Sequence, residues 1–81
     1  GVASITSESF EVALNSKTDI LNIQSSEAPI FNIKIYDLNG KKLIEQPFNS
    51  KSAVAINLNN FSNGVYVLKI NDLFISKVLK L

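Results

Sequence analysis

The side chains that could do chemistry in this chain of 81 residues are almost all carboxylates. The sequence contains no His, Cys or Trp, so it lacks the usual general base at neutral pH, the thiol nucleophile and the favoured zinc ligands. A pair of carboxylates could still act as acid and base, as in glycoside hydrolysis. The acids are Glu8, Glu11, Asp19, Glu27, Asp37, Glu45 and Asp72. Because they are spread through turns and exposed strand positions, we expect no catalytic residues and no enzymatic activity.

Two smaller groups could bind a metal ion or a sugar, but both have a simpler structural interpretation. Asp37 and Asn39 offer oxygen ligands of the kind that calcium prefers, yet in a turn such side chains accept backbone N–H bonds. Tyr36 and Tyr66 could form a platform that stacks on a sugar. Tyr66, however, is in phase with Leu68, which places its ring in the core. We therefore expect no metal, no cofactor and no small-molecule substrate.

Charge and composition restrict the partners further. The net charge is +1, and the cations are lysines that are scattered along the chain apart from Lys41 and Lys42. Without Arg or a basic stripe, nucleic-acid binding is not expected. No apolar run approaches the roughly 20 residues of a membrane helix. A chain so poor in reactive groups is better suited to being recognised by other proteins than to chemistry.

The elements that position these side chains are short β-strands. Apolar and polar residues alternate with period two in several segments, and turn residues separate them at roughly ten-residue spacing. The expected strands are 10–14, 21–24, 30–37, 43–46, 53–58, 65–70 and 73–81. Helical periodicity is nowhere sustained. The pattern predicts one all-β domain, an antiparallel immunoglobulin-like β-sandwich of about seven short strands.

The alternation also predicts which side chains form the core. Phe31 is in phase with Ile33 and Ile35, so all three are expected on the inner face of one strand. Phe61 is expected to close the sandwich from a connector as a plug. The expected core is Ile33, Ile35, Ile56, Leu58, Phe61, Tyr66, Leu68 and Ile70.

The last strand has an ambiguous phase. Two alternating sets of apolar residues compete for the interior, namely Ile75, Leu79 and Leu81 on one side and Phe74 and Val78 on the other. We expect a β-bulge near Ser76 and Lys77 to reconcile them.

Asn, Gly and Pro residues separate the strands. Asp37 to Gly40 predicts a hairpin turn, because Asn39 and Gly40 adopt positive φ at little cost. Asn71 and Asp72 predict a two-residue turn, and Pro47 marks an edge strand or a bulge. The residues expected to form the motif turns are Asp37, Asn39, Gly40, Lys41 and Gly64.

Taken in order, these segments resemble the type A C-terminal sorting domain of the type IX secretion system of Bacteroidetes. Leu21 and Ile23 resemble the family's L-x-I strand, whereas Asn15 and Ser16 stand where the family has an Asn-Pro turn. The central hairpin motif is represented by Ile35, Tyr36, Asp37, Gly40 and Lys41. The next segment is represented by Ile56, Leu58, Phe61, Gly64, Tyr66, Leu68 and Ile70, and the last strand by residues 77–81.

The resemblance implies that residues 10–81 form the sorting domain and that residues 1–9 are a linker or a cloning remnant. It implies a secretion signal that directs a covalently fused upstream passenger across the outer membrane and is then cleaved off. The implied partners are the translocon and a sortase-like surface protease, and the implied route runs through the periplasm to the cell surface or the medium. The expected recognition residues are Lys77, Val78, Leu79, Lys80 and Leu81, read by strand addition.

Two other functions stay open on the residues alone. One is an adhesion or carbohydrate-binding module of a secreted multidomain enzyme, and the other is a passive spacer. The structural alternative for Lys77 and Lys80 is an edge strand whose lysines deter aggregation. Self-association through edge strands is a further expectation that the sequence leaves open.

Overall fold

The computed structural model describes residues 10–81, and the expected linker, residues 1–9, lies outside the described residues. The described chain forms seven strands and no helix, so no helix is present that could cross a membrane. The strands are β1 (Phe10–Asn15), β2 (Ile20–Ser25), β3 (Ile30–Tyr36), β4 (Lys42–Lys51), β5 (Ala53–Asn57), β6 (Gly64–Ile70) and β7 (Phe74–Lys80). The prediction of an all-β chain with about seven short strands is confirmed.

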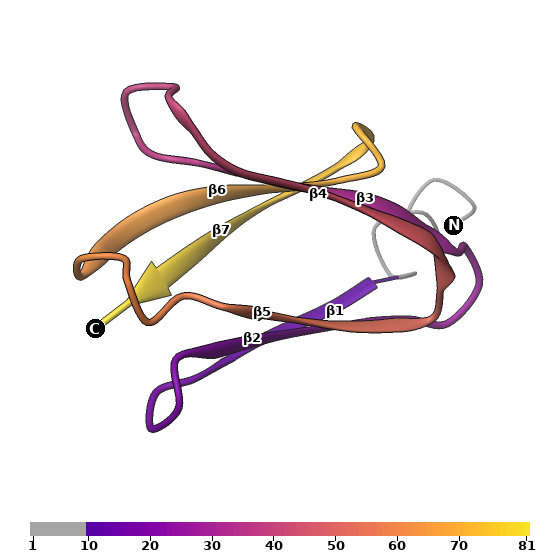
Figure 1. The fold of residues 1–81 in the computed structure, drawn as a ribbon, viewed down its shortest axis with the longest axis horizontal. Coiled ribbons are helices and arrows are strands. Elements are labelled where there is room, and N and C mark those ends of the chain that lie inside the picture. Colours follow the sequence, from indigo (N-terminus) through magenta and orange to yellow (C-terminus); the bar gives the residue numbers. More distant parts are fainter. Residues whose placement is uncertain (1–9) are drawn as a thin grey trace, which may run out of the picture.

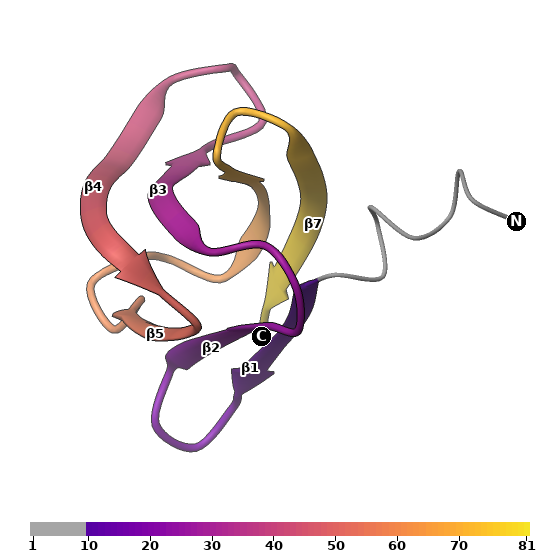
Figure 2. The same cartoon turned by 90° about the vertical axis from the view of Figure 1, so that its right-hand side faces the viewer.

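The strands form two antiparallel sheets that lie face to face, as Figure 1 shows. One sheet has three strands in the order β1-β2-β5, and the other has four strands in the order β4-β3-β6-β7. The chain crosses between the layers after β2, β4 and β5, which is the connectivity of an immunoglobulin-like sandwich. Figure 2 looks along the strands and shows β4 and β7 at opposite edges of the larger sheet.

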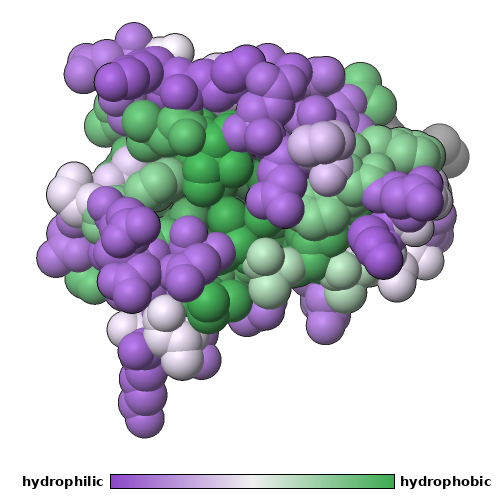
Figure 3. Space-filling model, viewed as in Figure 1, coloured by the Kyte–Doolittle hydropathy of each residue, from purple (hydrophilic) through white to green (hydrophobic). Residues whose placement is uncertain are grey.

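The core lies between the two sheets because alternate residues of each strand point inward. Leu21 and Ile23 of β2 are fully buried, and so are Leu68 and Ile70 of β6. The structure buries every residue of the expected core except Phe61, which is half-buried and packs against the core from the connector after β5. On the side where β4 and β5 lie, apolar side chains are visible between the two polar layers (Figure 3).

Side-chain oxygens of Asx residues hold two turns at the same end of the sandwich, the β1–β2 turn and the β3–β4 hairpin (Figure 1). Asp37 Oδ1 accepts the backbone N–H groups of Asn39 and Lys41 at 2.9 Å each. Gly40 alone supplies the positive φ of this hairpin, at 85°, whereas Asn39 was expected to share it. Asn15 Oδ1 accepts the N–H of Lys17 at 2.8 Å, which forms an Asx turn after β1.

Phe31 does not lie in the core, and that prediction is wrong. Its side chain is 53% exposed, and Ile30 is fully buried in its place. The pairing of β3 with β4 shifts register between Ile30 and Asn32, and this irregularity breaks the simple alternation at the start of the strand. Strict period-two counting from Ile33 therefore assigns Phe31 to the wrong face.

Pro47 lies within β4, which continues to Lys51 and is longer than expected. This strand is at the edge of its sheet, where a missing N–H costs least, so the expectation of an edge position is confirmed.

Candidate recognition surface

The site is built on β7, the strand that carries the expected recognition residues. β7 pairs with β6 along its whole length, from Ile70 opposite Phe74 to Gly64 opposite Lys80. No described strand pairs with the other side of β7, so its backbone groups there have no partner in a β-ladder among the described residues. Beyond that edge lies β1, whose Phe10 ring is 5.3 Å from the ring of Phe74 (Figure 2).

The alternation along β7 is regular, and the expected bulge near Ser76 and Lys77 is absent from the pairing. The inward set is Phe74, Ser76, Val78 and Lys80, and the outward set is Ile75, Lys77 and Leu79, with the exposed Leu81 directly after the strand. Ile75 is 60% exposed, Leu79 54% and Leu81 80%. The strand therefore places a lysine in the interior and aliphatic side chains in solvent, the reverse of what hydrophobicity alone favours.

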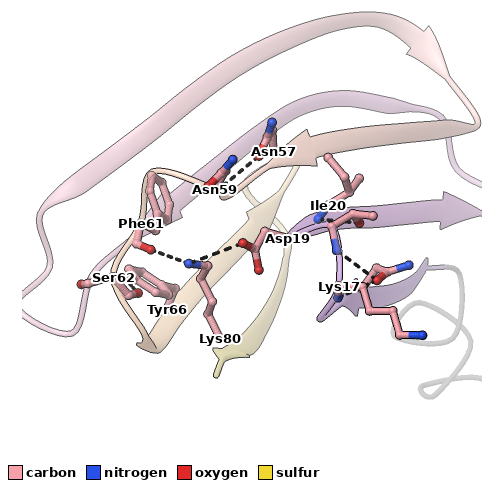
Figure 4. A network of polar contacts seen from close by, with 11 residues as sticks. Lys17, Asp19, Ile20, Asn57, Asn59, Phe61, Ser62, Tyr66 and Lys80 are labelled. Atoms are coloured by element: carbon pink, nitrogen blue, oxygen red, sulfur yellow. Dashed lines mark hydrogen bonds and ion pairs between the residues drawn. The ribbon is translucent and has the colours of Figure 1, made fainter.

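The contacts of Lys80 explain why this set of side chains faces the interior. Its side chain is only 8% exposed, and its ammonium group donates a hydrogen bond to the carbonyl oxygen of Phe61 at 2.6 Å. The carboxylate of Asp19, in the turn between β1 and β2, lies 3.9 Å from the same nitrogen. Figure 4 shows the ammonium group between these two oxygens. One cation thus joins the last strand to a connector and to the opposite sheet.

The connector that receives Lys80 is itself held in a compact form. The N–H of Phe61 donates to the carbonyl of Leu58 at 3.0 Å, and the Phe61 ring lies 5.2 Å from that of Tyr66. The hydroxyl of Tyr66 donates to the carbonyl of Ser62 at 2.5 Å. Gly64, the first residue of β6, follows the connector with φ of 153° and lies opposite Lys80 in the ladder. The carbonyl that binds Lys80 is therefore fixed before β6 begins.

The turn between β6 and β7 fixes the other end of the strand. Asn71 and Asp72 have φ of 56° and 59°, the positive values of a type I′ turn, and the N–H of Leu73 donates to the carbonyl of Ile70 at 3.0 Å. Leu73 is an extra residue, because Ile70 lies opposite Phe74. The predicted turn is present at Asn71 and Asp72, but the loop has three residues and not two, and the strand begins at Phe74 and not at Leu73.

The outer face beside β7 combines apolar and basic side chains. Val65 and Val67 of β6 lie opposite Leu79 and Lys77 and are half-buried. On the same face, the ammonium group of Lys69 lies 5.8 Å from the centre of the Tyr36 ring. This cation–π contact covers Tyr36 in part. Tyr66 points into the core, on the other face of the sheet, so the two tyrosines do not form a sugar platform.

Ion pairs hold two of the remaining lysines on this face. Lys34 lies 2.7 Å from Asp72, and the hydrogen bond between them raises the pKa of Lys34 and lowers that of Asp72. Lys42 pairs with Glu45, and this hydrogen bond lowers the pKa of Glu45. The described residues include no cluster of three or more metal-binding side chains.

The structure separates the five expected recognition residues into two groups. Lys77, Leu79 and Leu81 lie on the outer face, whereas Val78 and Lys80 are buried. The turn residues Asp37, Asn39, Gly40 and Lys41 lie together in the hairpin between β3 and β4. Sequence reasoning did not assign Ile75 to the outer face. Its position two residues before Lys77 could have shown this, because residues two apart in a strand lie on the same face.

Comparison with known families gives a match that extends over most of the chain. The sequence model of the secretion system C-terminal sorting domain matches residues 15–81, which are most of the chain. No curated protein matches the chain. The match covers β2 to β7, including the hairpin of Asp37 and the strand that ends at Lys80. The chain therefore belongs to the family of C-terminal sorting domains of the type IX secretion system, which serve as signals for export to the cell surface or the medium.

Proposed function

We propose that this domain directs a covalently fused upstream passenger across the outer membrane and that the secretion machinery reads the folded domain along β7. The family assigns the domain to type IX sorting and implies contact with that machinery. The edge position and the outward row of β7 support this strand as the place of contact.

The proposed route has three steps. The passenger and the domain enter the periplasm, where the domain folds. The translocon then recognises the folded domain and carries the fusion across the outer membrane. A surface protease that acts like a sortase cuts the chain before Phe10, and the passenger is released or attached to surface lipopolysaccharide.

The observation that carries the proposal is the inverted pattern of β7. The structure exposes Ile75, Leu79 and Leu81 and buries Lys80. If the strand presented its other face to the core, it would bury more apolar surface. Positions where a strand exposes apolar side chains and buries a charged one, against the usual pattern, are expected at functional sites. Strand addition at an open sheet edge uses both main-chain bonds and alternate side chains, and β7 offers both.

The experiment that tests the proposal is an export assay in a bacterium with a type IX system. A fluorescent passenger with its own signal peptide is fused ahead of residues 1–81, and its location and mass are followed. We expect the passenger outside the cell, shortened by about the mass of the domain, and retained inside when the translocon is deleted. A passenger that stays in the periplasm with a folded, uncut domain would contradict the proposal.

A pair of variants separates the surface of β7 from its interior. Replacing Ile75, Leu79 and Leu81 together by Ser removes the outward row and leaves the buried set intact. The matched control replaces Phe31 and Leu38, which are exposed elsewhere, by Ser. Export should fall for the β7 variant and stay unchanged for the control, with both domains folded by circular dichroism.

A further inference from the structure

The two outer faces of the sandwich differ in charge. The face of the four-stranded sheet carries Lys34, Lys42, Lys69 and Lys77 together with Glu45 and Asp72. The outward side chains of the three-stranded sheet are Glu11, Ala13, Asn15, Ile20, Asn22, Gln24, Ala53, Ala55 and Asn57. That second face contains no lysine among the described residues. A partner of the basic face is therefore expected to be acidic.

Near β7 the basic charge is not neutralised. Both acids of this face are paired, Asp72 with Lys34 and Glu45 with Lys42. Lys69 lies over the ring of Tyr36, and no described residue supplies a carboxylate to Lys77. The outward row of the edge strand is thus apolar, basic, apolar.

The open edge selects the class of partner. Unpaired backbone N–H and C=O groups along an edge strand are satisfied by another polypeptide in extended conformation, which a lipid head group cannot imitate. In an added strand, the side chains directly opposite those of β7 on the same face lie about 5 Å away. An acidic residue opposite Lys77, with apolar residues opposite Ile75 and Leu79, would complement the whole row.

A second copy of this chain complements the row less well. Two copies that pair antiparallel about the middle of the row bring Lys77 opposite its own copy, and like charges directly opposite each other are destabilising. Both copies also present the same basic face. Charge therefore favours a different, acidic chain over self-association.

We propose that β7 accepts an extended acidic segment of a partner protein as an additional strand, with an Asp or Glu of that segment opposite Lys77. The proposal rests on the proposed sorting function and names the chemistry of the partner segment. Lys80 contributes by position, because its buried contacts with Phe61 and Asp19 keep Lys77 on the outer face.

The test uses the whole chain and two labelled peptides that contain Val-Ser-Asp-Ser-Val or Val-Ser-Lys-Ser-Val between Ser and Thr residues. Fluorescence anisotropy at low salt measures their binding, and amide shifts in NMR locate it. We expect the Asp peptide to bind about tenfold more tightly than the Lys peptide, with the shifts along β7. Added salt should reduce the difference.

Charge reversal provides the matched variants. Lys77→Glu should invert the preference between the two peptides, and Lys17→Glu, in the exposed turn after β1, should leave it unchanged. Equal binding of both peptides, or shifts confined to β4 and β5, would overturn the proposal. Lys77-dependent binding to phosphatidylglycerol vesicles without peptide binding would also overturn it, as would a β7-mediated dimer in sedimentation.

The export assay distinguishes failure of this inference from failure of the sorting function. If the wild-type fusion is exported and Lys77→Glu is exported equally well, the acidic partner is wrong while the sorting function stands. If the wild-type fusion is not exported, the sorting function fails regardless of the peptide result. Export that falls at least several-fold in Lys77→Glu, with a folded domain, supports both.

Discussion

At the scale of single residues, Asn71 joins two distant parts of the larger sheet. Its side-chain oxygen accepts the N–H groups of Phe31 and Asn32 at 2.8 and 3.1 Å, and its amide donates to the carbonyl of Pro29 at 2.8 Å. Its backbone also has φ of 56°, which Asn tolerates better than most residues. The same residue therefore shapes the turn before β7 and fixes the irregular start of β3.

Replacement of Asn71 should separate these two tasks. We expect Asn71→Ala to lower the free energy of unfolding by about 2 kcal/mol, because it removes the amide bonds and places Ala at positive φ. Asn71→Gly removes the same bonds without the backbone cost and should lose less. Urea unfolding measures both, with the exposed Asn60→Ala as the control. Equal losses for Ala and Gly would show that the backbone conformation contributes nothing.

The ion pair of Lys34 and Asp72 predicts a pH dependence of stability. The pKa of Asp72 is below the ordinary value of 3.8, so its contribution is complete above that value and is lost as the pH falls through the lower folded value. The pKa of Lys34 is above 10.5, so its contribution is complete below that value and is lost as the pH rises through the higher folded value.

The variant Asp72→Asn should therefore be less stable than the wild type near neutral pH. The difference in Tm between the two proteins should shrink as the pH falls below 3.8. Thermal unfolding from pH 2 to 7 measures it. Glu27→Gln removes an exposed carboxylate for which no described residue provides an ion pair, and it should leave the profile unchanged. A difference in Tm that persists at the lowest pH would contradict the assignment.

At the scale of elements, β7 is the strand whose phase depends on contacts outside itself. Its outward-facing residues carry more aliphatic side chains than its inward-facing residues do. The strand is oriented with Lys80 inward because the Lys80 ammonium group contacts the carbonyl of Phe61 and the carboxylate of Asp19, which belong to other segments. A slip by one residue would expose the cation and break the charge-assisted bond.

Removing the charge of Lys80 should weaken this selection. We expect Lys80→Met to lower the free energy of unfolding by about 2 kcal/mol, because the carbonyl of Phe61 loses a charged donor. The exposed Lys77→Met should change it by less than about 0.5 kcal/mol. Urea unfolding gives both values, and NMR shows whether Leu79 stays exposed. Equal stability of the two variants would show that the buried contacts of Lys80 do not hold the strand.

The strands and their number could be predicted from sequence because period-two patterning and turn residues are local signals. Leu21, Ile23, Leu68 and Ile70 follow that pattern without exception. Phe31 does not, because a register shift against β4 reverses the parity at one residue. β7 does not, because a distant carbonyl and carboxylate decide which face Lys80 takes. The last strand could thus be named as a candidate site, while the face on which each of its side chains lies could not be predicted.

At the scale of the whole molecule, the strand proposed for recognition is also part of the folded core. Val78 is buried and Phe74 packs against the core, so removing β7 uncovers the interior beside β6. A deletion of Ser76 to Leu81 would therefore abolish export whether the machinery reads the strand or requires the fold. Point substitutions that respect the alternation are the only changes that distinguish a surface effect from unfolding.

A core variant completes that distinction. Leu68 is fully buried in β6, and Leu68→Ala should lower the free energy of unfolding by about 3 kcal/mol without touching the outer face. A domain of this size is marginally stable, so the variant should populate unfolded molecules as the temperature rises. If the machinery reads a folded surface, export of the reporter should fall with the folded fraction measured by circular dichroism at each temperature. The variant with Ser at 75, 79 and 81 should instead lose export at all temperatures while folded. Export of Leu68→Ala that stays at the wild-type level above its Tm would mean that the machinery reads β7 as a linear segment, and the geometry set by Lys80 would then be irrelevant to sorting.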